Sequence, residues 1–560
     1  MSLSWDEAVA AVCGPGSMFE VVEDQVAGRP GRTFARSPRS LRELFANSRA
    51  HGDATFLVYE DERWTFADVF AAADALGHAL VHRYGVVKGD RVAIAMRNYP
   101  EWVVAFIASL SVGAISVSLN SLWTADELEY AIGDCSPTVL VGDAERIARS
   151  RAACERQGVR MIAARTGPID GTDAWADVVV PGAQLPAVDI GPEDDATILY
   201  TSGTTGRPKG AVSTQRAVIS GLMGFGARAV VEAMRADPPP SDAPPSPPPS
   251  FILIVPLFHV TGCIPVLMSC VVAGLKLVIM YKWDVEQALE IIEREKITNF
   301  VGVPTQSWDL VNSPRFAEFD TSSLRSVGGG GAPAPPALVG KVASSFRNAG
   351  PQLGYGMTET NAYGPNHSGA DYIAHPTSTG RVLPIAEIEI RDVIDDRPLP
   401  VGGRGEIWFK GPNLIRGYWN RPDATAETIV DGWLRTGDIG RIDDEGFVYI
   451  EDRAKDMILR GGENVYGAEV EAAIYEHPAV HEAAVYGVPD ERLGEEVGVT
   501  VYLNAGHALA ADDLRAFLAE RIAPFKVPRV VMFADEPLPR NAAGKFLKRE
   551  LRDRAVAEGS

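Results

Sequence analysis

The chain has 560 residues, of which 46% are hydrophobic and 23% are charged, a composition typical of a soluble globular protein. This length exceeds what one hydrophobic core usually supports, so we expect two or more domains. The 74 acidic and 53 basic residues give a formal charge of −21, which disfavours nucleic-acid binding because a nucleic-acid-binding surface needs a basic face.

Cysteine usage and the apolar runs indicate a cytoplasmic protein without a transmembrane segment. The five cysteines form no C-x-x-C pair, which argues against structural zinc and against a disulfide framework. The first residues, MSLSWDEAVAAVCG, lack the basic segment of a signal peptide. Residues 102–123 and 251–275 are long uncharged runs, but glycine or proline interrupts both. We therefore expect each run to be a buried helix and a buried strand in succession.

Helical patterns alternate with short β-rich runs through the first half of the chain. We expect helices at 41–52 and 66–85, and buried strands at 91–96, 114–119, 138–143, 252–258, 275–280 and 299–304. This alternation predicts an α/β fold, with a large N-terminal domain of largely parallel β-sheets flanked by helices. The proline-rich segment 236–250 is expected to form an exposed, extended loop.

The pattern changes beyond about residue 380. Strands at 387–393, 405–410 and 447–453 indicate an antiparallel β subdomain, and a compact α+β pattern begins at residue 453. We therefore expect an N-terminal domain over residues 1–452 and a small C-terminal domain over residues 453–560.

One loop has the composition of a phosphate-binding site. Residues 198–210 read ILYTSGTTGRPKG, so an apolar run precedes a stretch of hydroxyl and glycine residues. The glycines let backbone amides approach an anion, the hydroxyls add donors, and Lys209 can neutralise phosphate charge. The spacing differs from the G-x-x-x-x-G-K-[ST] loop of other nucleotide-binding proteins.

This loop resembles the signature loop of the adenylate-forming superfamily, which includes acyl- and aryl-CoA synthetases, firefly-type luciferases and the adenylation domains of peptide synthetases. Other stretches resemble the remaining motifs of that superfamily, in the same order. They are PLFHVTG (256–262), GGGGAPAP (328–335), GYGMTET (354–360), GWLRTGDIGRID (432–443), EDRAKDMILRGGENVY (451–466) and LPRNAAGKFLKREL (538–551). The resemblance covers the chain beyond about residue 40 and is greatest to fatty- and medium-chain acyl-CoA synthetases.

The resemblance implies a reaction in two halves. A carboxylate attacks the α-phosphorus of ATP and gives an acyl-adenylate and pyrophosphate, and a thiol, usually coenzyme A, then displaces AMP. The first half needs no general base, because a carboxylic acid is ionised at pH 7. Catalysis must instead come from cations and hydrogen-bond donors around the phosphates. ATP, Mg²⁺ and coenzyme A as co-substrate are therefore expected.

The resemblance also assigns roles to individual residues. Lys545 is expected to stabilise charge at the bridging oxygen and the α-phosphate, Thr358 to contact the α-phosphate, and Glu359 to ligate Mg²⁺ together with Thr205. The other residues expected to bind ATP or AMP are Thr201, Ser202, Gly203, Thr204, Gly206 and Lys209 for the phosphates, Gly331, Ala332, Pro333, Tyr355 and Gly356 for adenine, and Asp438 and Arg453 for the ribose or phosphate.

The C-terminal domain is expected to move between the two half-reactions. Lys455 matches the hinge position of the superfamily. Rotation there would withdraw Lys545 and bring the loop 460–464 to the site. In CoA ligases this loop lines the pantetheine tunnel, so Gly461 and Gly462 are expected to contact coenzyme A.

The acyl pocket is expected from the segments 254–262, 301–305, 328–332 and 354–360, with four consecutive glycines, among them Gly330, leaving space near the carboxylate. His259 either gates this pocket or is a hydrogen-bonded polar residue at a strand end. These stretches contain no basic residue that could pair with a second carboxylate, so a monoacid with an apolar body is favoured.

Two positions depart from the superfamily pattern. Gln215 stands where a histidine is usual, which leaves the floor of the acyl or ATP pocket open to change. Residues 540–542 replace the usual start of the last motif, although Lys545 is retained.

The leading hypothesis is an AMP-forming acyl-CoA synthetase of fatty acid or lipid metabolism. The alternatives are an acyl-AMP ligase that loads a carrier protein, a luciferase-like oxygenase, and a nucleotide-binding pseudoenzyme; Lys545 and Glu359 argue against the last. The expected partners are a small carboxylic acid, ATP and coenzyme A, with no nucleic acid, and a homodimer is left open.

Overall fold

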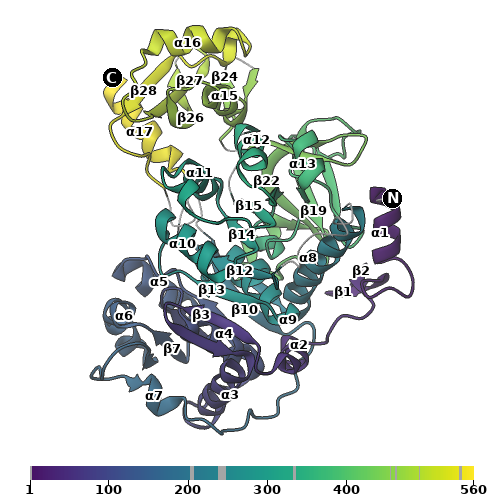
Figure 1. The fold of residues 1–560 in the computed structure, drawn as a ribbon, viewed down its shortest axis with the longest axis vertical. Coiled ribbons are helices and arrows are strands. Elements are labelled where there is room, and N and C mark those ends of the chain that lie inside the picture. Colours follow the sequence, from purple (N-terminus) through teal and green to yellow (C-terminus); the bar gives the residue numbers. More distant parts are fainter. Residues whose placement is uncertain are drawn as a thin grey trace.

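Two β-sheets of eight strands each form most of the N-terminal part of the protein (Figure 1). The computed structural model describes residues 3–201, 207–236, 247–331, 336–453, 456–460, 463–490, 492–540 and 545–559. The first sheet has the strand order β20-β11-β10-β6-β5-β7-β8-β9, and the second has the order β17-β16-β15-β14-β12-β13-β3-β4. Antiparallel pairs occur only towards the ends of these orders, which confirms the largely parallel sheets.

Most strands lie close to the positions that the sequence predicts, but the strand expected at 252–258 is shorter and lies earlier, at Ser250–Leu253, because Pro256 has no amide to donate within a sheet. The first sheet consists of β5 (Arg91–Ala95), β6 (Ile115–Ser118), β7 (Val139–Gly142), β8 (Arg160–Ala163), β9 (Asp173–Ala174), β10 (Asp195–Thr201), β11 (Lys209–Thr214) and β20 (Gly417–Tyr418). The second consists of β3 (Thr55–Tyr59), β4 (Glu62–Thr65), β12 (Ser250–Leu253), β13 (Lys276–Ile279), β14 (Asn299–Gly302), β15 (Ser326–Gly330), β16 (Gly350–Gly354) and β17 (Asn366–Ser368).

Helices cover the sheets and fill the space between them. They include α2 (Leu41–Ser48), α3 (Phe66–His82), α4 (Pro100–Ser111), α5 (Ala125–Cys135), α6 (Ala144–Gln157), α8 (Gln215–Arg235), α9 (Ser269–Ala273), α10 (Val285–Glu295), α11 (Pro304–Asn312) and α12 (Pro336–Ser345). All of α4 is buried, as expected of a helix that is apolar on every face. The hydrophobic core to which α4 belongs also contains residues of both sheets. The predicted succession of a buried helix and a strand over 102–123 is therefore confirmed.

Helix α8 is long and apolar enough to cross a membrane by length and composition, and it is the one such helix among the described residues. Sequence patterns did not single it out. Within its most apolar window, 56% of the residues are buried inside the protein, as in the core helix of a soluble protein. Its residues contribute to the core that contains both sheets. We therefore interpret α8 as a core helix.

Antiparallel strands form the subdomain that follows. They are β18 (Glu387–Arg391), β19 (Gly405–Lys410), β21 (Ile429–Val430), β22 (Trp433–Ile442) and β23 (Val448–Arg453). A short N-terminal unit, α1 (Trp5–Cys13), β1 (Val21–Val26) and β2 (Arg29–Phe34), packs beside it and against α8.

The C-terminal elements lie at one end of the molecule, next to α11 (Figure 1), where Asp309 interacts electrostatically with His481 and Arg540. They are β24 (Ile458–Arg460), β25 (Glu463–Val465), α15 (Gly467–Tyr475), β26 (Val480–Asp490), β27 (Gly494–Leu503), α16 (Ala511–Ala519), β28 (Val530–Ala534) and α17 (Lys548–Gly559). They enclose hydrophobic clusters of their own, as expected of a separate domain.

Four neighbouring parallel strands end at one edge of the second sheet. Strands β12, β14, β15 and β16 are paired side by side and in parallel, so their carboxyl ends lie together. The segments expected to form the acyl pocket begin at or beside these four strand ends. In open α/β sheets, ligands bind at the carboxyl ends of the strands. The topology thus brings these segments to one place.

Close backbone contact at this edge requires glycine at position 329. A Cβ atom added to Gly329 would lie 1.6 Å from the carbonyl oxygen of Gly302 on the neighbouring strand. The structure could accommodate it only by moving one strand.

We expect Gly329→Ala to destabilise the N-terminal domain by about 1–3 kcal/mol, the usual cost of overpacking a core. Gly340→Ala is the matched control, because a Cβ at this exposed position of α12 meets no atom within 4 Å. In a helix that change is worth up to about 1 kcal/mol of added stability. Urea-unfolding midpoints measure both variants, and equal midpoints for the two would contradict the close strand contact.

Candidate active site

Two antiparallel strands flank the phosphate-loop motif. Strand β10 ends at Thr201 and strand β11 begins at Lys209, and these two residues face each other across the antiparallel pair. The Thr201 hydroxyl donates to the carbonyl oxygen of Lys209 over 3.4 Å. Lys209 is thus the first residue of a strand and not part of the loop itself. The loop residues Ser202, Gly203, Thr204, Thr205 and Gly206 lie outside the described residues.

The turn that carries Thr358 and Glu359 follows β16 and is tightly wound. Asn361 and Ala362 have φ angles of +52° and +61°, a left-handed conformation that residues other than glycine seldom adopt. The turn has room only for glycine at position 356, because a Cβ there would lie 2.2 Å from the carbonyl oxygen of Ala362. Consecutive residues with this backbone conformation are typical of functional sites, where surrounding contacts hold the strain.

The segment Asn413–Tyr418 holds this turn against the hairpin. The Asn413 side chain donates to the carbonyl oxygen of Thr360 over 2.8 Å, and the Ile415 amide donates to that of Glu359 over 2.9 Å. Two residues further on, β20 pairs with β11, with Tyr418 opposite Ala211. The segment therefore connects the two elements that are expected to bind the phosphates, and sequence reasoning missed it.

Glu359 is buried, with 6% of its surface exposed, and its Oε1 accepts a hydrogen bond of 2.7 Å from the Tyr418 hydroxyl. The ammonium of Lys209 lies 4.8 Å from the centre of the Tyr418 ring. Tyr418 therefore contacts both an expected phosphate ligand and the expected magnesium ligand.

A tyrosine hydroxyl also forms a hydrogen bond with Asp438, the expected ribose-binding residue. Tyr355, next to the turn of Thr358 and Glu359, donates from its hydroxyl to Oδ2 of Asp438 over 2.5 Å. Asp438 is buried on β22 and pairs in register with Arg453 of β23. The structure thus brings Tyr355, Asp438 and the backbone of Arg453 together; the Arg453 side chain is outside the described part of the chain.

The segment that contains His259 is held by Asn98, in the connection between β5 of the first sheet and α4. Asn98 donates to the carbonyl oxygen of Val255 over 3.1 Å and accepts from the amide of Leu257 over 2.9 Å. The chain then enters a π-helix over Gly262–Met268, a rare form that is frequent at functional sites. A side chain at Gly262 would meet the carbonyl oxygen of Pro256. Asn98 was not singled out from the sequence.

Lys545 of the C-terminal domain lies near His259. Burial, and then the positive charge of Lys545, lower the pKa of His259 to about 4, so the imidazole is neutral at pH 7. Its Nδ1 accepts from the amide of Thr261 over 3.3 Å, which leaves the proton on Nε2. The arrangement of the two domains is thus one in which Lys545 reaches the large domain.

The glycine run and Gln215 differ from expectation. Backbone atoms of neighbouring strands occupy the side-chain positions of Gly328, Gly329 and Gly330, so open space adjoins only Gly331, at φ +81°. Gln215 is buried, and its Oε1 accepts from the amide of Leu41 over 2.9 Å. The glycines therefore allow close contact between strands more than they leave space for a pocket. Gln215 holds the N-terminal end of α2.

Some expected site residues cannot be placed, because they lie outside the described residues. They are the loop residues named above, Ala332, Pro333, Lys455, Gly461 and Gly462. The same holds for most of the proline-rich segment, over 237–246.

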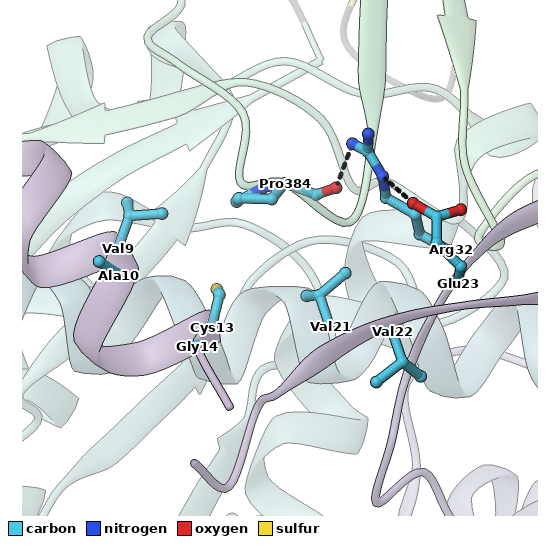
Figure 2. A pocket seen from close by; sticks show the side chains of 9 residues that line it. All are labelled: Val9, Ala10, Cys13, Gly14, Val21, Val22, Glu23, Arg32 and Pro384. Carbon is cyan, nitrogen blue, oxygen red and sulfur yellow. Dashed lines mark hydrogen bonds and ion pairs between the residues drawn. The ribbon is translucent and has the colours of Figure 1, made fainter. Parts of the chain in front are cut away.

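A cavity of about 290 Å³ lies between α1, β1 and Pro384 and contains none of the expected site residues (Figure 2). Its one guanidinium, that of Arg32, already donates to the carbonyl oxygen of Pro384 over 2.9 Å and to Glu23 over 3.2 Å. This cavity therefore lies apart from the expected nucleotide-binding residues.

Comparison with known proteins agrees with this geometry. The profile of the AMP-binding enzyme family matches residues 44–419, and that of the AMP-binding enzyme C-terminal domain matches residues 469–545. The chain is 34% identical over 501 residues to a long-chain-fatty-acid–CoA ligase of Mycobacterium tuberculosis. The matched region covers 89% of this chain and 94% of the relative. The chain is 34% identical over 511 residues to a feruloyl-CoA synthase of Amycolatopsis, over 90% of this chain and 97% of the relative.

A solved structure shares the fold. The o-succinylbenzoate CoA synthetase of Bacillus subtilis, in complex with its acyl-adenylate intermediate, matches with a TM-score of 0.76 and 30% identity, over 91% of this chain and 97% of that one. The chain belongs to the family of AMP-binding enzymes. Its fold and chemistry are those of an adenylate-forming ligase of the acid–thiol class, as the motifs predict.

The contact between Lys545 and His259 can be tested by titration. We expect Lys545→Ala to raise the pKa of His259 from about 4, because a positive charge that disfavours imidazolium is removed while the burial stays. NMR of histidine-labelled protein measures the pKa, with His259→Gln to assign the signal. Lys526→Ala, on the same domain, is the control and should leave the pKa unchanged. An unchanged pKa in Lys545→Ala would contradict the proximity of the two residues.

Proposed function

We propose that the chain activates a monocarboxylic acid with an apolar body and transfers its acyl group to coenzyme A, with ATP and Mg²⁺. One observation carries this proposal. Lys209, Glu359, Tyr355, Asp438 and His259 come from distant parts of the chain and lie on connected elements, and Lys545 reaches the same region from the C-terminal domain. This combination of cations, hydrogen-bond donors and two carboxylates, one expected to bind Mg²⁺ and one the ribose, suits a reaction between two anions.

In the first half-reaction the chain binds and orients ATP and the carboxylic acid, and no residue has to remove a proton. Thr201 and Lys209 would hold the β- and γ-phosphates, and Thr358 the α-phosphate. Asp438 can accept hydrogen bonds from the two ribose hydroxyls. Lys545 would place its ammonium at the oxygen between the α- and β-phosphates, where negative charge develops as the bond breaks.

The carboxylate of Glu359 fits a site for Mg²⁺. One of its oxygens is bound by Tyr418, and within the described residues the other has no hydrogen-bond partner. The described residues contain no cluster of three or more metal-binding side chains, which suits a cation that is held by one carboxylate and by substrate phosphates. When bound, Mg²⁺ neutralises phosphate charge; Thr205 is the proposed second protein ligand.

The second half-reaction requires a different arrangement of the domains. We propose that residues 1–452 and 453–560 move as separate bodies about Lys455. The motion would withdraw Lys545 and bring Gly461 and Gly462 to the coenzyme A thiol, which then attacks the acyl carbonyl and releases AMP. The separate hydrophobic clusters of the C-terminal domain support this division.

The apolar body of the acid is supported by the residues around the expected pocket. The segments 254–262, 301–305, 328–332 and 354–360 contain no lysine or arginine, so a second carboxylate would find no partner there. Neutral His259 suits a gate that must not attract the phosphates of ATP into the acyl pocket. The relatives named above act on aliphatic and on aromatic acids.

We further propose a cytoplasmic enzyme, because all five cysteines are unpaired and buried. A homodimer is a hypothesis for sedimentation analysis. Loading of a carrier protein is the second candidate acceptor reaction, and it is distinguished by the acceptor used in the assay below.

The assay supplies ATP, Mg²⁺ and a panel of fatty, aromatic and alicyclic acids, with either coenzyme A or a carrier protein. We expect pyrophosphate and acyl-CoA with at least one of these acids. Pyrophosphate without acyl-CoA would exclude coenzyme A as the acceptor, and no pyrophosphate with any acid would contradict the ligase function.

With the preferred acid, we expect Lys545→Ala to slow pyrophosphate formation roughly 10²–10³-fold, the usual effect of removing a group aimed at transition-state charge. Thioester formation from supplied acyl-adenylate should stay within a few-fold of wild type. Lys526→Ala is the control and should keep both rates. An equal loss of both half-reactions in Lys545→Ala would contradict a residue that serves adenylation alone.

A further inference from the structure

Tyr418 is the common neighbour of two side chains of opposite charge. Its hydroxyl donates to Oε1 of Glu359 over 2.7 Å, while the Lys209 ammonium lies 4.8 Å from the ring centre. Yet within the described residues Lys209 and Glu359 form no ion pair with each other. A cation on the face of an aromatic ring is attracted by the ring, and a carboxylate is bound by its hydroxyl.

We propose that Tyr418 is a positioning residue of the ligase, which keeps Lys209 and Glu359 apart and turns the free oxygen of Glu359 towards the magnesium–nucleotide complex. The inference rests on the proposed function of these two residues. Tyr418 itself touches neither the phosphates nor the acid in this account, and it acts only through its two neighbours.

The backbone of Tyr418 is held from two sides, as a positioning residue requires. It pairs with Ala211 of β11, and its amide donates over 2.9 Å to the hydroxyl of Thr425, in the helix over Pro422–Thr428. Glycine precedes it of necessity, because Gly417 has a φ of +155° and its side-chain position lies 2.6 Å from Thr425. The backbone from which the Tyr418 side chain extends is therefore held in the same sheet that contains Lys209.

The hydroxyl of Tyr418 occupies one of the two carboxylate oxygens of Glu359. It donates to Oε1 over 2.7 Å, and within the described residues Oε2 has no hydrogen-bond partner, so Oε2 is the oxygen available to a metal ion. Mg²⁺ demands nearly ideal octahedral geometry, so the direction of that oxygen matters.

Two substitutions separate the two contacts. Tyr418→Phe removes the hydroxyl and keeps the ring, so it frees the Glu359 carboxylate while Lys209 stays in place. Tyr418→Leu removes the ring as well, so Lys209 and Glu359 can pair and cancel each other's charge. Tyr84→Phe is the matched control, because the Tyr84 hydroxyl also donates to a carboxylate, that of Asp173, over 2.9 Å, among residues outside the proposed site.

Binding of Mn²⁺, measured by electron paramagnetic resonance in the presence of a non-hydrolysable ATP analogue, is the direct test and needs no carboxylic acid. We expect Tyr418→Phe to weaken Mn²⁺ binding about 10–100-fold, as for other residues that orient a metal ligand, with unchanged affinity for the analogue without metal. Tyr418→Leu should in addition weaken binding of the metal-free analogue. Tyr84→Phe should match wild type in both measurements.

Wild-type Mn²⁺ affinity in Tyr418→Phe would overturn the inference, even if its ligase activity fell. If wild type itself bound no Mn²⁺–nucleotide complex, the proposed function would fail together with the inference. The effect of Tyr418→Phe is also measured in a Glu359→Gln background, with circular dichroism to check that each variant is folded. There the substitution should have little further effect on Mn²⁺ binding, because Tyr418 acts through Glu359, whereas a full additive loss would contradict that.

Discussion

One stretch of backbone, Asn413–Tyr418, determines how the parts of the site lie relative to one another. On one side it binds the turn of Thr358 and Glu359, through the Asn413 side chain and the Ile415 amide, and on the other it pairs with β11. The turn itself has an unfavourable left-handed backbone at Asn361 and Ala362, which it would not keep in isolation. The hydrogen bonds from this stretch therefore stabilise both the conformation of the turn and its distance from the hairpin. Electrostatic catalysis depends on such fixed groups, because donors that are already oriented need no rearrangement as charge develops.

The sheets supply the frame on which this stretch acts. Four parallel strands place their carboxyl ends side by side, and close contact at Gly329 keeps two of them together. Asn98, which follows β5 of the first sheet, binds the His259 segment, which follows β12 of the second. Lys545 approaches His259 from the C-terminal domain. The domain motion proposed above would move this cation, which suits a reaction that needs the cation in only one of its two halves.

The sequence predicts much of this arrangement, for identifiable reasons. Buried parallel strands are continuous apolar runs, so β5, β6, β7 and β13 were found within a residue or two. Motifs expected to contact nucleotides are short and local, so Thr201, Lys209, Thr358 and Glu359 could be proposed as site residues from the sequence alone. Tyr418, Asn413 and Asn98 could not, because their partners are 59, 53 and 157 residues away and no local pattern marks such a contact. The π-helix at Gly262 was equally hidden, since Pro265 within an apolar run suggests a break. The glycines at 328–330 were correctly singled out but served strand contact and not space.

The central claim is that this site directs the acid to the α-phosphorus of ATP, while the hairpin holds the pyrophosphate that leaves. Oxygen-isotope transfer tests it most directly. The preferred acid, labelled with ¹⁸O in both carboxylate oxygens, is turned over with ATP and coenzyme A, and the products are analysed by mass spectrometry. Attack at the α-phosphorus predicts one ¹⁸O atom in each AMP and none in the pyrophosphate. Label in pyrophosphate or phosphate, or AMP without label, would contradict the account.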